Sequence, residues 1–473
     1  MLQRLKAGAV HFKESMGEQL LGYIGLPSDE VGKDDRGNNQ GALLHSTNKN
    51  NNNNYAVRAV SAKEPIIYDI SFDSIYDAYL DCRKNKRTSN SCTLFDFDYE
   101  LELVALWNSI RTAQYKPSFS YCFIVSSPVY REVFAASFID RVVHHWIALR
   151  IEPIIEHRFV EQGNVSKNCR KGQGSKSAIA DLDTMIKEAS DNYTKDCYVF
   201  KGDFTNFFMS MDKALMWEMV QLFVLDNYHG EDLQCLLYLL RETINNCPQD
   251  NCVLRSPRSF WNNLPKRKSL FHTPKSKGLP IGNLSSQLLA NFYASCFDEW
   301  MTEVKGVKHY IRFVDDFVFI LPRKEDILTL IPEIKQYLSE QLLTELHPNK
   351  IYVQHYSHGV PFVGAVVKPG RIYISNRTRS HFYNKIRIYN SYAEQGLQAQ
   401  YVEKFVQSIN SYLGLMIHYN TYRIRKKICS ELILPQWHQY LYFVNGYRYA
   451  RVKVQYRTHR KARQRAKGNT AFI

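Results

Sequence analysis

Residues 310–320 are YIRFVDDFVFI, and this stretch decides the fold. Two apolar runs flank Asp315 and Asp316, and they are rich in the aromatic and β-branched residues that favour strands. The pattern predicts a β-hairpin that carries both carboxylates at its tip. Aspartate is also common in ordinary solvated turns, but such a turn does not require apolar residues on both sides. We therefore expect both acids at the edge of a buried sheet.

A third acid, Asp203, ends another predicted strand in residues 197–204, CYVFKGDF. If this strand lies beside the hairpin, Asp203 reaches the same sheet edge as Asp315 and Asp316. Hard divalent cations prefer carboxylate oxygens. Two such ions can activate an attacking hydroxyl and hold the phosphoryl group that is transferred. The three acids therefore predict a site for two Mg²⁺ ions and nucleotidyl transfer.

The overall composition favours a nucleic-acid partner. The chain has 473 residues, 45% of them hydrophobic, which is enough for two or three subdomains around a core. Its formal charge of +15 and pI of about 9.2 are too basic for a typical enzyme of a small neutral metabolite. No apolar run approaches the roughly 20 residues that a membrane span needs. The N-terminus also lacks the apolar core of a secretory signal, so we expect a cytoplasmic protein with no membrane partner.

The cysteines and histidines predict no metal site. None of the ten cysteines forms a CxxC pair, so we expect reduced thiols that mostly pack in the core. The spacing of Cys247 and Cys252 leaves a metal or disulfide pair open as the lesser alternative. His144 and His145 are expected to pack or to form hydrogen bonds.

Local patterns divide the chain into several regions. Residues 1–62 are expected to form a flexible appendage, because residues 31–62 lack apolar periodicity and contain an asparagine run at 50–54. Apolar spacing predicts helices within residues 68–110 and 141–156. A further helix is predicted over residues 285–297, opened by serines that are suited to capping. After residue 375 the pattern is helical, aromatic and basic.

The order of several motifs resembles the fingers and palm of reverse transcriptases. The motifs are REVF (131–134), DR (140–141), GDFTNFF (202–208), GLPIGNLSSQ (278–287), FVDD (313–316), LHPNKI (346–351) and PFVG (361–364). The resemblance covers about residues 65–450. Within that superfamily, IGNLSSQ and CRKGQG (169–174) resemble the reverse transcriptases of diversity-generating retroelements, particularly the Bacteroidetes type.

The resemblance implies an α/β fold with an α+β palm, arranged as a right-hand polymerase. The N-terminal region and fingers are expected within residues 63–200. The palm is expected within 195–370, with a fingers insertion at about 228–280. A helical thumb and basic tail would fill 371–473, and the tail would neutralise duplex phosphates or simply be a solvated terminus.

The same resemblance assigns roles at the reaction centre. Asp203 and Asp315 correspond to the principal metal ligands, with Asp316 beside them. Lys350 corresponds to the lysine that protonates the leaving pyrophosphate, a general-acid role. A solvated lysine is the ordinary alternative at this position.

Two arginines correspond to positions that bind the incoming triphosphate. Arg131 matches the fingers arginine and Arg141 the second basic position, because a guanidinium binds phosphate bidentately and keeps its charge. A structural ion pair with Asp140 is the alternative for Arg141. The lysine that some families place shortly before Arg131 is absent from VSSPVYR (125–131). Triphosphate contacts are therefore fewer or supplied elsewhere.

Four further residues correspond to nucleotide-binding positions. Phe208 falls at the aromatic steric gate that excludes a 2′-hydroxyl, with core packing as the alternative. Ile281, Gly282 and Gln287 belong to the motif that contacts the nucleotide and template. Ile281 occupies the position where accurate retroviral enzymes have a glutamine, and Gly282 would permit close approach to the template and nascent pair.

Three residues correspond to the primer and template side of the site. Phe362 and Gly364 match the primer-grip turn. Phe313 replaces the tyrosine that is usual before the two acids and so lacks one hydroxyl near the primer.

The resemblance implies RNA-directed DNA synthesis in mutagenic retrohoming, in which errors at template adenines rewrite a variable repeat. The implied partners are template RNA, RNA/DNA duplex, deoxynucleoside triphosphates and a small basic accessory variability protein. An antiphage-defence or retron-like reverse transcriptase is the nearest alternative. A catalytically silent RNA-binding scaffold is an alternative of another class, and burying three acids without cations argues against it.

Residues 31–62 have a second interpretation besides a linker. Asparagine is encoded only by AAC or AAT, so this stretch comes from adenine-rich DNA. In diversity-generating elements the adenines of the template repeat are rewritten. The segment could therefore be a template repeat translated ahead of the enzyme.

Overall fold

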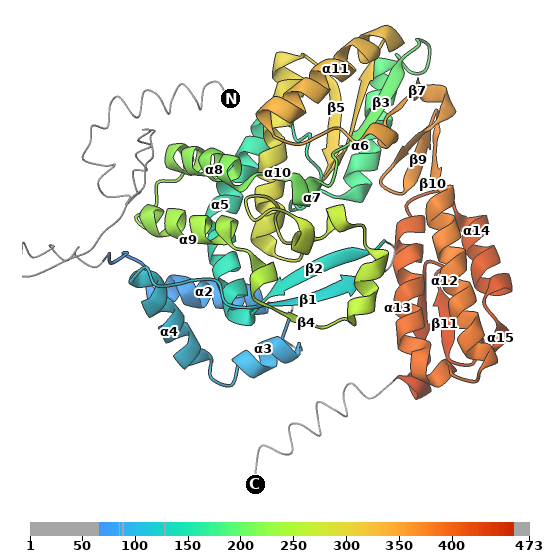
Figure 1. Cartoon of the computed structure of the whole chain (residues 1–473). Helices are drawn as coiled ribbons and strands as arrows, with labels where there is room; N and C mark the ends of the chain where they lie inside the picture. Colours follow the sequence, from blue (N-terminus) through green and yellow to red (C-terminus); the bar gives the residue numbers. More distant parts are fainter. Residues whose placement is uncertain (1–65, 85, 88, 127–128, 458–473) are drawn as a thin grey trace, which may run out of the picture.

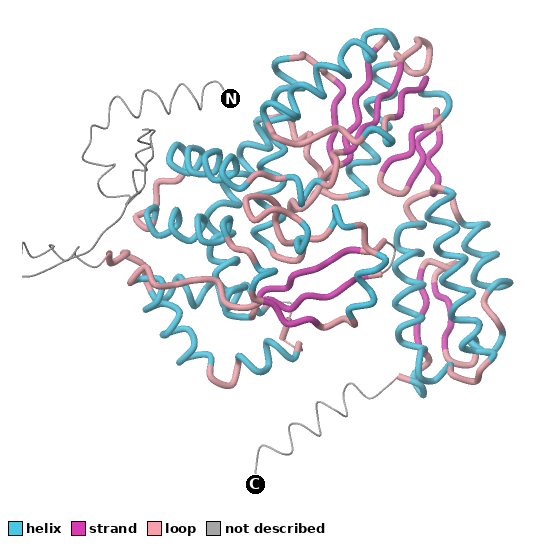
Figure 2. Tube along the Cα trace, viewed as in Figure 1, coloured by secondary structure: helices cyan, strands magenta, loops and turns pink. Residues whose placement is uncertain are grey.

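The computed structural model describes residues 66–457, apart from residues 85, 88, 127 and 128. The appendage predicted at residues 1–62 and the end of the basic tail lie outside the described residues. Figure 1 shows the C-terminal helices as a lobe beside the rest of the chain. In Figure 2 the strands gather in separate sheets among the helices, and a further pair of strands lies within the C-terminal lobe.

The first sheet has four antiparallel strands in the order β5-β6-β3-β7. Its strands are β3 (Tyr198–Asp203), β5 (His309–Phe313), β6 (Asp316–Leu321) and β7 (Tyr352–His355). β5 and β6 form the hairpin that the sequence predicted, and Asp316 is the first residue of β6. Successive side chains of a strand point to opposite faces, and successive residues in the middle of β5 and of β6 are buried. Both faces of the hairpin are therefore covered by the rest of the protein.

Helices cover both faces of this sheet. Val199 and Val318 pack on one face with α6 (Ser175–Ala189). Phe200 and Phe319 stack on the other face, with ring centroids 4.6 Å apart. That second core also includes α5 (Phe138–Glu161), α10 (Leu284–Glu299) and α11 (Lys324–Gln341).

The second sheet has three strands in the order β2-β1-β4. β1 (Ser120–Val125) pairs antiparallel with β2 (Arg131–Ala136) and parallel with β4 (Cys252–Leu254). The N-terminal helices pack near this sheet against α5: α2 (Phe72–Arg83), α3 (Asn90–Phe95) and α4 (Tyr99–Arg111). The helices predicted within residues 68–110 and 141–156 are thus confirmed.

The segment between the two sheets contains α7 (Phe207–Ser210), α8 (Lys213–Asn227) and α9 (Leu233–Asn245). After α9 the chain continues through short 3₁₀ turns to α10. These turns are η1 (Pro248–Asp250), η2 (Arg258–Asn263), η3 (Lys266–Lys268) and η4 (Leu270–His272).

A third small sheet leads into the C-terminal lobe. It consists of β8 (Val360–Phe362), β9 (Ala365–Lys368) and β10 (Arg371–Ile374). The lobe contains α12 (Asn376–Glu394), α13 (Gln398–Met416), α14 (Tyr422–Lys427) and α15 (Pro435–His438). Trp437 is fully buried, and its ring centroid is 4.4 Å from that of Phe405. The lobe also has a hairpin, β11 (Leu441–Val444) and β12 (Tyr449–Val452), which the helical pattern did not predict.

The predicted capping of α10 by serine is wrong. The N-cap residue is Asn283, whose side chain makes no capping hydrogen bond, and Ser285 lies inside the helix. Ser285 Oγ instead bonds to His144 Nδ1 at 2.7 Å. Residues on almost every side of α10 are buried. A polar side chain there therefore needs a hydrogen-bond partner within the protein.

The cysteines and the membrane prediction can also be compared with the structure. All ten cysteines are free, so Cys247 and Cys252 form no disulfide. Cys247 and Cys252 are partly exposed. In the described part of the chain, no helix is long and apolar enough to cross a membrane.

Candidate active site

Strand pairing brings the three predicted acids together. Asp203, the last residue of β3, pairs in register with Asp316, the first residue of β6. The backbone N–H of Phe204 donates to the carbonyl oxygen of Asp315 at 3.1 Å. The carboxyl-bearing ends of β3 and of the β5–β6 hairpin are therefore adjacent.

Burial and mutual repulsion make the site electrostatically unusual. Burial, followed by the charge of Asp315, raises the pKa of Asp203 to about 7. Burial also raises the pKa of Asp315, and the charge of Asp316 adds to that effect. Carboxylates that are desolvated beside one another resist ionisation unless a cation accompanies them. Such a site favours positive charge.

Two lysines supply positive charge to these acids. Lys350 Nζ donates to Asp203 Oδ2 at 2.7 Å, and Lys201 Nζ lies 3.3 Å from Asp316 Oδ2. The ion pair with Lys350 lowers the pKa of Asp203, but burial outweighs it and the pKa stays raised. We attribute this balance to the exposure of Lys350, which solvent screens, whereas Asp203 is 5% exposed.

The donor set suits a hard cation, although the side chains are not arranged around one. In the described ranges, no group of three or more His, Cys, Asp or Glu residues is positioned to hold a metal ion. Lys350 and Lys201 contact Asp203 and Asp316 instead. Three carboxylates at one sheet edge still match the oxygen ligands that Mg²⁺ prefers. These are the residues that could bind it.

Arg312 is a residue of this site that the sequence reasoning missed. It is fully buried, and its Nε and Nη2 bond to both carboxylate oxygens of Asp298 at 2.7 and 2.6 Å. Its Nη1 donates to the carbonyl oxygen of Val314 at 3.0 Å. Val314 has φ of +59°, an unfavourable backbone conformation for a β-branched residue. A charged residue in the middle of an apolar strand was the available signal.

The two predicted triphosphate arginines differ in their surroundings. Arg131 is exposed at the start of β2, and its charge lowers the pKa of Asp315, so the two lie within electrostatic reach. Arg141 Nε donates to the carbonyl oxygen of Ala136 at 2.8 Å. The alternative of an Arg141–Asp140 ion pair is wrong, because Asp140 accepts hydrogen bonds from other residues: Tyr115, Ser118 and Ser137.

The predicted nucleotide-binding residues lie where β2 meets the start of α10. Phe208 and Ile281 are half-buried and pack against one apolar cluster. Gly282 has φ of +126°, and a Cβ there would lie 2.8 Å from Val133 Cγ1. The close approach that requires glycine is therefore to β2 in this structure. Gln287 is exposed, and Cys169 Sγ donates to its Oε1 at 3.5 Å.

The predicted primer-side residues lie on two different turns. Phe313 is half-buried, whereas Phe362 is 1% exposed in the core beside α6. Val363 and Gly364 both have positive φ, as a two-residue hairpin turn requires. The carbonyl oxygen of Gly364 accepts from Thr378 Oγ1 at 3.1 Å, which ties the turn to α12. Contact with primer stays a prediction.

Comparisons with known proteins agree with this geometry. Residues 127–367, just over half of the chain, match the family model of reverse transcriptase (RNA-dependent DNA polymerase). No curated protein sequence matches the chain.

Solved structures of low similarity were also found. One is telomerase from Candida albicans in complex with a TWJ fragment of telomeric RNA (TM-score 0.39, 11% identity, 68% of this chain and 59% of that chain). Another is apo telomerase from Candida tropicalis (TM-score 0.41, 12% identity, 67% of this chain and 58% of that chain). The chain spans less than two thirds of either telomerase.

Proposed function

This chain belongs to the reverse transcriptase family, and on that premise we propose that Asp203, Asp315 and Asp316 hold two Mg²⁺ ions. Membership makes the chain an RNA-directed DNA polymerase with a mixed α/β polymerase fold. The proposal rests on one observation: Asp203 pairs in register with Asp316, and Asp315 directly precedes Asp316 in the chain. When bound, the ions would activate the primer 3′-hydroxyl and hold the triphosphate.

The lysine beside these acids has a proposed role of its own. Lys350 Nζ holds a proton 2.7 Å from Asp203 and would donate it to the leaving pyrophosphate. The side chain is 49% exposed, so it has room to leave Asp203 when a cation binds there. Arg131 would bind the triphosphate, because its charge already acts on Asp315. Phe208 would exclude a 2′-hydroxyl, and Phe313, Phe362 and Gly364 would contact the primer.

We also propose the polymerase division of the chain that was expected from the motifs. Fingers lie within residues 63–200, a palm within 195–370 and a thumb within 371–473. The separate apolar core around Trp437 supports a C-terminal unit of its own.

The proposed biological role is mutagenic retrohoming with an accessory variability protein. Its support is the IGNLSSQ motif, in which Ile281 cannot make the hydrogen bonds of a glutamine amide. The codons that encode the asparagines of residues 31–62 are rich in adenine, which agrees with a template repeat close to the gene. An antiphage-defence or retron-like enzyme would share the reaction centre but not a second genomic repeat.

Two experiments test these proposals. Primer extension on an RNA template with Mg²⁺ should yield DNA, and binding of RNA without any synthesis would favour the silent scaffold. The flanking genome should contain an imperfect repeat that differs from the template copy almost only at adenines. A genome without such a repeat would favour the defence or retron-like alternative.

A further inference from the structure

Lys213, the first residue of α8, is a buried cation that is not paired with a carboxylate. The residue is 5% exposed. Its Nζ donates to the carbonyl oxygen of Asn246 at 2.8 Å and to Cys247 Sγ at 3.3 Å. Within the described part of the chain, Lys213 forms no ion pair with an acid. A buried ammonium group normally has an acidic partner, whereas this one has a carbonyl oxygen and a thiol.

The bond to Asn246 has an ordinary structural explanation. Asn246 is the C-cap residue of α9. A cation near the last carbonyl groups of a helix stabilises that end of the helix. This role needs only the carbonyl oxygen, and it does not require a cysteine sulfur beside the same ammonium group. The contact with Cys247 therefore indicates a second property of this pair.

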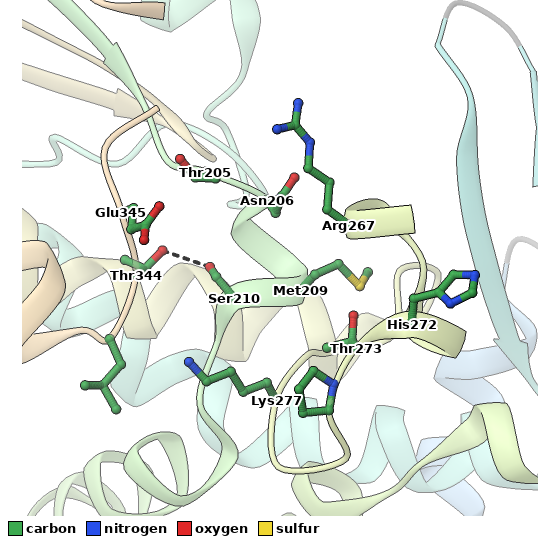
Figure 3. A pocket seen from close by; sticks show the side chains of 12 residues that line it. Thr205, Asn206, Met209, Ser210, Arg267, His272, Thr273, Lys277, Thr344 and Glu345 are labelled. Atoms are coloured by element: carbon green, nitrogen blue, oxygen red, sulfur yellow. Dashed lines mark hydrogen bonds between the residues drawn. The ribbon is translucent and has the colours of Figure 1, made fainter. Parts of the chain in front are cut away.

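The backbone around Lys213 is fixed by the segment that precedes α10. The backbone N–H of Lys213 donates to the carbonyl oxygen of Ser276 at 2.9 Å. The same two segments line one pocket, Ser210 from the segment after β3 and Lys277 from the segment before α10 (Figure 3). The amine of Lys213 therefore meets Cys247 from a defined position.

Cys247 combines this lysine contact with access to solvent. The residue is partly exposed, and its Sγ lies 3.6 Å from the carbonyl oxygen of Asn245 and 3.8 Å from that of Lys275. In the described ranges, Cys247 is the one cysteine whose sulfur accepts a hydrogen bond from a lysine. Accessible thiols are the ones that small oxidants reach.

We propose that Lys213 and Cys247 form a reversible cross-link when the protein meets hydrogen peroxide. The peroxide oxidises the Cys247 thiol to a sulfenic acid and is itself reduced to water. Lys213 releases one proton to solvent, and its amine attacks the sulfur. An S–N bond forms, the S–O bond breaks, and the hydroxyl group leaves as water with a second hydrogen from the nitrogen. The flexible four-carbon stem of lysine allows the amine to approach the sulfur.

A small thiol reverses the cross-link. Its thiolate attacks the sulfur of Cys247, the S–N bond breaks, and the nitrogen leaves as the free amine of Lys213. The resulting mixed disulfide is then reduced by a second thiol. While it lasts, the cross-link joins the start of α8 to the residue after the C-cap of α9. Such a link restricts the unfolded chain more than the folded one, so the oxidised protein should melt at a higher temperature.

Peptide mass spectrometry of the full chain after brief exposure to hydrogen peroxide tests the proposal. We expect the Lys213 peptide joined to the Cys247 peptide, lighter by two hydrogen atoms than their sum, and we expect dithiothreitol to separate them. Lys213→Met keeps a long apolar side chain but removes the amine. This variant should give no linked peptide, and its Cys247 should be trapped by dimedone, a reagent specific for sulfenic acids.

Cys169 is the matched control. It is exposed, and its sulfur accepts from Asn168 Nδ2 at 2.8 Å instead of from a lysine. Dimedone should therefore label Cys169 equally in the wild type and in Lys213→Met, and Cys169 should form no link to a lysine.

The outcomes decide between the cross-link and a lysine that only caps α9. Dimedone labelling of Cys247 in the wild type without a linked peptide would overturn the proposal. A disulfide from Cys247 to another cysteine would overturn it as well. The melting temperature gives a second measurement: oxidation should raise it by a few degrees in the wild type but not in Cys247→Ser. An equal change in both proteins would show that no stabilising link forms at Cys247.

Discussion

Arg312 donates from Nη1 to the carbonyl oxygen of Val314, 3.0 Å away, and so holds the turn that precedes Asp315. The same guanidinium is bound to Asp298, and both side chains are fully buried. Val314 keeps a positive φ within this arrangement. A buried charge pair thus fixes the position of the proposed metal ligands.

The first prediction tests that arrangement with Arg312→Lys. Lysine keeps a charge opposite Asp298 but cannot reach both Asp298 and Val314 with a rigid fork. We expect kcat to fall about tenfold and the Mg²⁺ concentration for half-maximal rate to rise. Arg323→Lys is the control, because Arg323 forms an exposed pair with Asp326. A lower melting temperature with unchanged Mg²⁺ dependence would reduce Arg312 to a purely structural role.

The second prediction concerns Asp315→Asn. The change removes the charge of a proposed ligand and leaves the basic surface intact. DNA synthesis in Mg²⁺ should fall at least about a thousandfold, while RNA affinity stays within about twofold. The control is Asp326→Asn in the first turn of α11, where the aspartate forms an exposed pair with Arg323. Equal rates for mutant and wild type would remove Asp315 from the reaction centre.

The third prediction concerns fidelity. Ile281 is half-buried beside Phe208, and its side chain has no hydrogen-bonding group. If an amide at this position steadies the nucleotide, Ile281→Gln lowers misincorporation opposite template adenine, as counted by sequencing the cDNA. Ile281→Leu keeps an apolar side chain and should leave the error rate unchanged. An unaltered adenine error rate in the glutamine variant would exclude Ile281 from control of fidelity.

The fourth prediction concerns acid stability. Burial lowers the pKa of His144 to about 4, whereas an unfolded histidine titrates near 6.5. Between these values the unfolded chain binds more protons, so the free energy of unfolding falls as pH drops from 6.5 toward 4. From pH 7 to pH 5 this loss is about 2 kcal/mol. His144→Asn should lose that much less stability over the same interval in urea titrations. An identical pH dependence would mean that His144 is not buried in the neutral form.

The fifth prediction concerns residues 1–62. If they are a translated template repeat or a linker, deleting them leaves primer extension within about twofold of wild type, because the described core begins after them. Loss of synthesis on this truncation would make the segment a true domain.

Much of the reaction centre follows from local pattern. The hairpin of residues 310–320 and the strand that ends at Asp203 were predicted from apolar runs that stop at acids. Those signals are short-range, because strand propensity and turn chemistry depend on neighbouring residues. The helices of the C-terminal lobe were predicted in the same way, whereas its hairpin β11–β12 was not.

Other features depend on contacts between distant segments. Asp203 meets Asp316 because β3 lies between β6 and β7, and that strand order is set by packing of the whole sheet. Ser285 can lie inside α10 because α5, a distant segment, supplies His144 as its hydrogen-bond partner. Position 282 requires glycine because a Cβ there would clash with Val133 of β2, a strand far earlier in the chain.

By itself, the sequence determined the hairpin of residues 310–320, the strand that ends at Asp203, most of the helices, and the family to which the motif order belongs. Only the tertiary structure decided that Arg312 is buried against Asp298 and holds Val314, and that buried Glu132 accepts hydrogen bonds from Trp261, Ser269 and Leu270. The physical reason is that propensity is a property of neighbouring residues. Burial, and the pKa values and ion pairs that follow from it, depend on which distant segments the fold packs together.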